Sequence, residues 1–183
     1  KSSFNNGLPR VKYKNLHHND NGKLEALHFV KDLGFCIIED APIKEGLVLS
    51  VISELGFTRE TNYGQLFEVR TEVNPNNLAY TNMGLGSHTD NPYRDPVPTV
   101  QLLHCLESST EGGDSVLVDG FNAAKILRQE SSENFKALTN NWINFRFSDE
   151  KTDLRSRVPM IEVNDNGEVI KVRYNNRSID TIK

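Results

Sequence analysis

Apolar residues in the first third of the chain recur at intervals of three and four positions, the spacing of an amphipathic helix. This spacing predicts helices over 23–34 and 45–56, and each range ends on a glycine, Gly34 and Gly56. The run F-C-I-I-E-D at 35–40 is short and mostly apolar, which predicts a strand between the two helices. The first third therefore reads as helix, strand, helix.

Farther along the chain, alternating and continuous apolar runs bounded by turn residues become common. They predict strands over 64–72, 99–108, 114–121 and 142–150. Two helices are predicted between the last two strands, over 122–130 and over 131–140, the second with a serine at its start. The turn Asp165-Asn166-Gly167 predicts a β-hairpin within 158–174.

Composition limits the function more than the fold. The 183 residues carry a net charge of −4 with acids and bases interspersed, so we expect no nucleic-acid partner and no anionic membrane. The chain has neither the roughly 18 apolar residues of a membrane span nor the core of a signal peptide. Its length predicts a single domain. Cys36 and Cys105 lie in apolar runs, which favours buried, reduced thiols and a cytoplasmic protein.

The candidate chemistry lies in G-L-G-S-H-T-D-N-P-Y-R-D-P-V-P, residues 84–98. In a strand, His88 and Asp90 would project to the same side, because successive side chains alternate. An imidazole and a carboxylate on one side can bind one cation, as in the non-haem Fe(II) oxygenases, whose protein ligands leave three coordination positions open. A polar turn between two strands is the alternative. The glycines before the pair and the prolines after it favour a fixed site.

Residues 74–124, from N-P-N-N-L-A-Y to D-G-F-N-A-A, resemble the gamma-butyrobetaine dioxygenase branch of the taurine-dioxygenase-like Fe(II)/2-oxoglutarate-dependent oxygenases. That branch also contains trimethyllysine and trimethylaminoethylphosphonate dioxygenases. The resemblance implies a mostly β fold with flanking helices, a double-stranded β-helix (jelly roll), over 23–183. We expect the polar, turn-rich residues 1–22 to form an irregular arm. The resemblance also implies Fe(II) held by His88 and Asp90, 2-oxoglutarate as cosubstrate, O2 as oxidant, and a homodimer.

The same resemblance implies an aromatic cage for a quaternary ammonium substrate. Its walls would be Tyr63, Phe67 and Tyr80, with Tyr93 as a further lining residue, and a cation gains about 0.5–2 kcal/mol over such a ring. Asn77 matches a position that helps to hold the acidic end of the substrate or the cosubstrate. Without the resemblance, each aromatic residue would be interpreted as core and Asn77 as part of the turn N-P-N-N.

The resemblance further requires a third ligand, a histidine on a late strand, and an arginine that pairs with 2-oxoglutarate through a bidentate contact. Of the five histidines only His104 follows Asp90, and its apolar surroundings predict a packed core residue. We therefore expect the final strands of the jelly roll, this histidine and this arginine to be missing from the chain. It is then part of a longer protein, a fragment without turnover, or a divergent protein that kept only the scaffold.

The expected function is hydroxylation of a small trimethylammonium compound, with the conversion of gamma-butyrobetaine to L-carnitine as the first choice. A trimethylaminoethylphosphonate dioxygenase is the second choice within the same class. From another class, the chain could be a catalytically silent module that binds quaternary ammonium compounds. Binding that needs no iron would distinguish that module from an enzyme.

Overall fold

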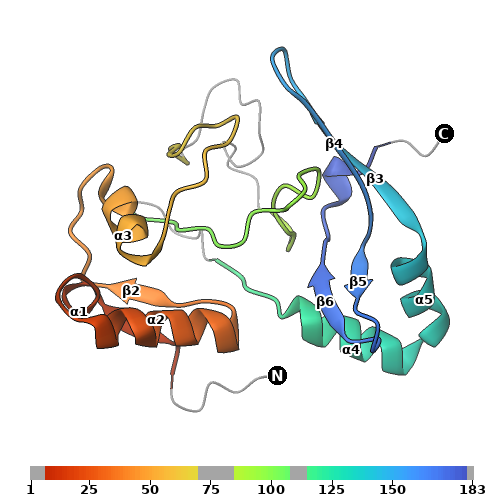
Figure 1. Cartoon of the computed structure of the whole chain (residues 1–183), viewed down its shortest axis with the longest axis horizontal. Coiled ribbons are helices and arrows are strands. Elements are labelled where there is room, and N and C mark those ends of the chain that lie inside the picture. The colour runs from red at the N-terminus through yellow and green to blue at the C-terminus, as the bar shows by residue number, and fades with distance from the viewer. Residues whose placement is uncertain (1–6, 70–84, 108–114, 181–183) are drawn as a thin grey trace. The chain divides into compact units, whose positions relative to one another are not determined.

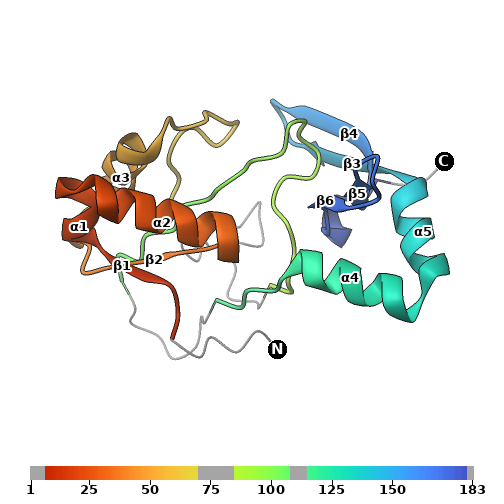
Figure 2. The ribbon, with the colours of Figure 1, turned by 60° about the horizontal axis from the view of Figure 1, so that its bottom comes forward.

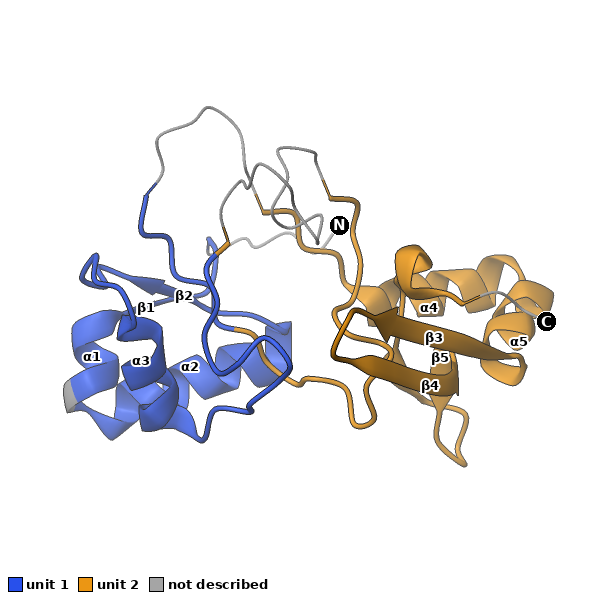
Figure 3. Ribbon diagram, turned by 90° about the horizontal axis from the view of Figure 1, so that it is seen from above, with its two compact units in different colours: residues 1–68, 102–111 blue, residues 69–101, 112–183 orange. Residues whose placement is uncertain are grey.

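A computed structural model of the chain describes residues 7–69, 85–107 and 115–180. They group into two compact units, shown in blue and orange in Figure 3. Unit 1 comprises 1–68 with 102–111, and unit 2 comprises 69–101 with 112–183. Each unit has its own apolar core, and each is described by itself.

Unit 1 combines a parallel pair of strands with helices. Its elements are strand β1 (Arg10–Lys12), helix α1 (Tyr13–His18), helix α2 (Asp20–Leu33), strand β2 (Ile37–Glu39) and helix α3 (Leu47–Leu55). Helix α2 runs along the β1–β2 pair (Figure 2). The core forms around Val11, Leu16 and Ala26. Both predicted helices and the strand between them are confirmed, and Gly34 takes the left-handed conformation (φ +85°) where α2 ends.

The start of unit 1 contradicts the predicted irregular arm. Residues 10–22 form β1, α1 and the first turn of α2. Helix α2 approaches α1 so closely that a Cβ at Gly22 would lie 2.4 Å from the backbone oxygen of Asn15, so only glycine fits there. The polar composition of residues 1–22 did not predict these elements for two reasons. Strand β1 pairs with β2, which lies beyond α2 in the chain, and few apolar side chains bury this segment.

Unit 2 consists of two helices, two antiparallel strand pairs and a short 3-10 helix within its described part. They are α4 (Gly120–Glu130), α5 (Ser132–Asn140), β3 (Trp142–Ser148), β4 (Asp153–Pro159), β5 (Ile161–Val163), β6 (Val169–Val172) and η2 (Asn176–Ser178). Helix α4 contacts β6 and α5 contacts β5, around the buried residues Ala124, Phe135 and Ile161 (Figure 1). Phe145 on β3 is fully buried.

The predicted helices of unit 2 and its hairpin are confirmed. Ser131 caps α5 by accepting a hydrogen bond from the backbone N–H of Asn134 at 3.3 Å. Gly167, at φ +77°, supplies the turn between β5 and β6. Strand β4 was not predicted before position 158, because polar residues such as Asp153 and Arg155 alternate with its half-buried positions.

The predicted strands over 64–72, 99–108 and 114–121 are wrong in their described parts. In the first predicted strand, Gly64 makes only an isolated bridge. In the last, helix α4 already begins at residue 120. The other described positions of the three segments join no strand ladder. A strand needs a hydrogen-bonded neighbour, and the described residues supply none here. Apolar side chains of these segments are consequently open to solvent: Leu103 is 71% exposed and Val116 is 75% exposed.

The described strands pair only two by two, in the pairs β1–β2, β3–β4 and β5–β6, so they do not themselves close a jelly roll. Within 7–69, 85–107 and 115–180, no helix combines the length and the apolar character that crossing a membrane requires.

Candidate functional site

His88 and Asp90 meet in a loop of unit 2. Residues 85–101 contain neither helix nor strand, so the pair does not sit on the strand that its spacing suggested. The two side chains nevertheless face each other, with Nε2 of His88 3.3 Å from Oδ1 of Asp90. Both side chains reach solvent, at 34% and 49% exposure. The loop therefore presents one nitrogen and one carboxylate oxygen at one accessible point.

The orientation of the His88 ring suits a metal ligand. Its Nδ1 lies 2.7 Å from the backbone oxygen of Gly86. A carbonyl can only accept, so Nδ1 is the donor in this contact and Nε2 is the ring nitrogen that faces Asp90. A backbone partner of this kind is what metal-bound histidines ordinarily have on their second nitrogen.

The separation of the two ligand atoms also suits a metal. Nε2 of His88 and Oδ1 of Asp90 lie 3.3 Å apart, so both atoms could bind one cation placed between them. Two ligands at right angles, each about 2.1 Å from a metal, lie about 3 Å apart. His88 and Asp90 thus fit two adjacent coordination positions of one divalent cation.

The described ranges 7–69, 85–107 and 115–180 contain no cluster of three or more His, Cys, Asp or Glu residues suited to a metal. His104 belongs to unit 1 and is half-buried, so its predicted core position is wrong; its segment gains no sheet partner among the described residues. Cys105 is exposed for the same reason, against the prediction, whereas burial raises the pKa of the half-buried Cys36 thiol. Both thiols are free.

The chain after His88 and Asp90 is packed onto the β3–β4 hairpin. Pro92 is fully buried, and its carbonyl accepts a hydrogen bond from the Ser156 hydroxyl at 2.6 Å. The ring of Tyr93 stacks on Phe147 with 5.3 Å between centroids, and its hydroxyl donates to Oδ1 of Asn91 at 2.5 Å. Tyr93 is only 6% exposed, which gives it a packing role; its part in lining a substrate pocket stays a prediction.

Tyr63 and Phe67 form an aromatic pair in unit 1. Their ring centroids lie 5.7 Å apart with 45° between the planes. A turn fixes Tyr63, because its N–H donates to the Thr61 hydroxyl at 3.1 Å and Gly64 takes φ +82°. Tyr63 is half-buried, and Phe67 is 43% exposed. The structure thus brings together two of the aromatic residues predicted for the cage.

Two of the predicted substrate residues, Asn77 and Tyr80, lie outside the described residues. Asn176 donates from Nδ2 to the hydroxyl of Tyr174 at 3.3 Å. No sequence pattern pointed to Thr89 and Asn175, which bond to each other across 86 positions. Their order in the chain could not reveal this contact, although Thr89 lies directly between the two predicted metal ligands.

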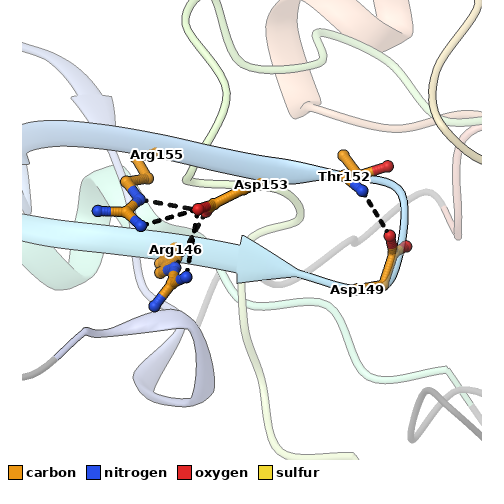
Figure 4. A network of polar contacts seen from close by, with 5 residues as sticks. All are labelled: Arg146, Asp149, Thr152, Asp153 and Arg155. Atoms are coloured by element: carbon orange, nitrogen blue, oxygen red, sulfur yellow. Dashed lines mark hydrogen bonds and ion pairs between the residues drawn. The ribbon is translucent and has the colours of Figure 1, made fainter.

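A charged network stiffens the β3–β4 hairpin (Figure 4). Asp153 accepts hydrogen bonds from Arg155 and Arg146, and these bonds hold the pKa of its carboxyl far below the ordinary range. At the tip, Asp149 accepts from the backbone N–H of Thr152 at 2.7 Å. The hairpin that supports Pro92 and Tyr93 is therefore fixed at the turn and between its strands.

Comparison with known proteins identifies relatives for nearly the whole chain. The profile of the family described as "Taurine catabolism dioxygenase TauD, TfdA family" matches residues 4–182. A gamma-butyrobetaine dioxygenase of Pseudomonas sp. (strain AK-1) is 35% identical over 169 residues, 92% of this chain and 44% of that protein. The gamma-butyrobetaine dioxygenase of Homo sapiens is 33% identical over 180 residues, covering 96% of this chain and 46% of that protein.

A trimethyllysine dioxygenase of Meyerozyma guilliermondii is 33% identical over 152 residues, which cover 81% of this chain and 38% of that protein. The chain thus spans less than half the length of these curated relatives.

Proposed function

Because this chain belongs to the taurine catabolism dioxygenase TauD, TfdA family, we propose that the protein carrying it is a Fe(II)- and 2-oxoglutarate-dependent dioxygenase. The family implies a jelly-roll dioxygenase fold, in agreement with the predicted fold class. The observation that carries the proposal is the facing pair of His88 Nε2 and Asp90 Oδ1 at 3.3 Å, with Nδ1 of the same ring engaged by Gly86.

We propose a small trimethylammonium compound as the substrate, and gamma-butyrobetaine as the first choice. The relatives are named for gamma-butyrobetaine and for trimethyllysine, which share a quaternary ammonium group. Such a group carries no N–H, so it is recognised by aromatic faces rather than by hydrogen bonds. The paired rings of Tyr63 and Phe67 offer two such faces.

Iron held at this site would supply the oxidation: with 2-oxoglutarate and O2, one oxygen atom would enter a C–H bond of the substrate, and the other would enter the succinate formed as 2-oxoglutarate loses CO2. The described residues do the positioning. His88 and Asp90 would hold the cation through Nε2 and a carboxylate oxygen. Tyr63 and Phe67 bind the trimethylammonium end, and we propose that Tyr80 adds a wall while Asn77 bonds the acidic end.

The test is succinate formation by the natural full-length protein with Fe(II), 2-oxoglutarate, O2 and gamma-butyrobetaine. We expect substrate-dependent turnover that falls at least 100-fold in His88→Ala, because loss of a direct ligand should exceed the 10–100-fold effect of losing a residue behind one. His28→Ala, at an exposed position of α2, is the matched control and should retain turnover. Binding of gamma-butyrobetaine without iron and without turnover would instead identify a silent binding module.

A further inference from the structure

We infer that Thr89 and Asn175 form a clamp that positions His88 and Asp90 for metal binding. The inference rests on the proposed function, since it concerns how the two ligands of that site are held. We call Thr89, Tyr174 and Asn175 with their mutual hydrogen bonds the Thr89 clamp.

The clamp consists of three hydrogen bonds between distant parts of the chain. The N–H of Thr89 donates to the backbone oxygen of Tyr174 at 2.8 Å. In return, the N–H of Tyr174 donates to the hydroxyl oxygen of Thr89 at 2.9 Å. The side-chain amide of Asn175 donates to the backbone oxygen of Thr89 at 3.1 Å. Thr89 therefore engages its N–H, its carbonyl and its hydroxyl with the same two residues.

These bonds act on the two peptide units that flank the ligands. The N–H of Thr89 belongs to the peptide unit that joins it to His88, and its carbonyl belongs to the unit that joins it to Asp90. Each unit is planar, so a bond to one of its atoms restricts rotation of the whole plane. The clamp consequently limits the backbone rotations that would turn the His88 and Asp90 side chains apart.

The other side of the clamp is itself rigidly held. Arg173, directly before Tyr174, is 3% exposed, and its N–H donates to the backbone oxygen of Met160 at 2.8 Å. Its guanidinium donates to Oε2 of Glu162 at 2.9 Å. Burial acts to raise the pKa of Glu162, but the bond from Arg173 and the charge of Lys171 outweigh it and lower the pKa. The carboxylate thus stays charged near neutral pH and keeps Arg173 in place.

The clamp matters because the ligands have little packing of their own. With 34% and 49% of their side chains exposed, His88 and Asp90 cannot be fixed by a surrounding core. The Gly86 contact holds the ring of His88, and the buried Pro92 anchors the chain two residues after Asp90. Between these two points, the bonds of Thr89 hold the backbone that carries both ligands. Loss of a group behind a metal ligand typically lowers metal affinity 10–100-fold. Thr89 and Asn175 are positioning residues in this sense.

The test is a titration of the natural full-length protein with Co(II) alone, in which the visible absorption of the bound metal measures binding. Thr89→Val keeps the shape but removes the hydroxyl acceptor, and Asn175→Ala removes the amide donor. We expect each to raise the Kd for Co(II) about 10-fold or more, and Thr89→Ser to restore affinity to within about twofold of wild type. Hydrogen exchange of the Tyr174 amide should accelerate in Thr89→Val and stay slow in Thr89→Ser.

The matched control is Thr139→Val in α5, where the lost hydroxyl donates to the Lys136 carbonyl at 3.1 Å, away from the clamp. It should leave the Kd for Co(II) unchanged even if it lowers Tm. If Thr89→Val lowers only Tm, as Thr139→Val does, and Co(II) affinity is retained, the clamp is refuted while the metal site stands. If wild type binds no Co(II), or His88→Ala binds it equally well, the metal site of the proposed function fails, and the clamp fails with it.

Discussion

Replacement of Phe67 by alanine tests the aromatic site directly. A cation is attracted to a ring when it lies within about 6 Å of the ring centroid. The centroids of Tyr63 and Phe67 are 5.7 Å apart and their planes are tilted by 45°, so one trimethylammonium group can lie within that distance of both. Phe67→Ala removes one of the two rings and leaves the turn that holds Tyr63.

The expected loss follows from the exposure of the ring. A cation over one aromatic face gains about 0.5–1 kcal/mol at exposed sites and about 2 kcal/mol when desolvated. Phe67 is 43% exposed, which places it in the lower range, and about 0.5–1 kcal/mol corresponds to a two- to fivefold rise in Kd. Phe67→Trp should act in the opposite direction, because indole is the strongest of the three aromatic faces.

Calorimetric titration with gamma-butyrobetaine and with an uncharged analogue, in which carbon replaces the ammonium nitrogen, separates charge from shape. Both ligands lose the same apolar contact in Phe67→Ala, so any additional loss for the cation measures its attraction to the ring. Phe57→Ala is the control, since Phe57 lies in the same unit and is 89% exposed. Equal losses for the two ligands would refute a cation site at this pair.

Two further predictions concern stability. Gly22→Ala should lower the free energy of unfolding, because about 1–3 kcal/mol of overpacking against Asn15 exceeds the roughly 1 kcal/mol gained in helix propensity. Gly120→Ala is the control, since the added Cβ would lie 3.6 Å from Val172, an ordinary contact distance. In the same thermal melts this control should be neutral or stabilising. Equal melting temperatures for the two variants would contradict the close helix approach. Glu162→Gln should cost about 1.5 kcal/mol at pH 7, near the lower value for a charged hydrogen bond. The folded-state pKa of Glu162 is lowered, so the stability that its carboxylate contributes is present above the unfolded pKa of about 4.3 and is lost as pH falls through the folded pKa. Urea unfolding should therefore show a smaller difference in unfolding free energy between Glu162→Gln and wild type at pH 3 than at pH 7. An equal difference at the two pH values would contradict this prediction.

The elements that the sequence predicted well are those whose signals are local. Gly34 ends α2, Ser131 caps α5 and Gly167 turns the β5–β6 hairpin, each within a few residues of the feature it determines. The failures depend on distant partners. Strand β1 forms because β2 pairs with it, and the runs at 99–108 and 114–121 form no strand in their described parts because the described residues provide no neighbour.

The candidate site divides in the same way. The spacing of His88 and Asp90 predicted through a strand that their side chains share one side; the side chains do face each other, but on a loop, so the strand was wrong. The pairing of Tyr63 with Phe67 followed from the family resemblance and agrees with their 5.7 Å contact. The contact between Thr89 and Asn175 could not be predicted, because no local pattern links a threonine to an asparagine 86 residues away.

The uncovered run Val116-Leu117-Val118 has a practical consequence for handling the protein. These three side chains are 75%, 65% and 59% exposed, and consecutive apolar residues of this kind favour pairing between chains when no strand of their own chain covers them. Expressed by themselves, the residues of this chain would therefore tend to self-associate as their concentration rises. Solubility, measured before any activity, is therefore an informative property of a protein made from these residues.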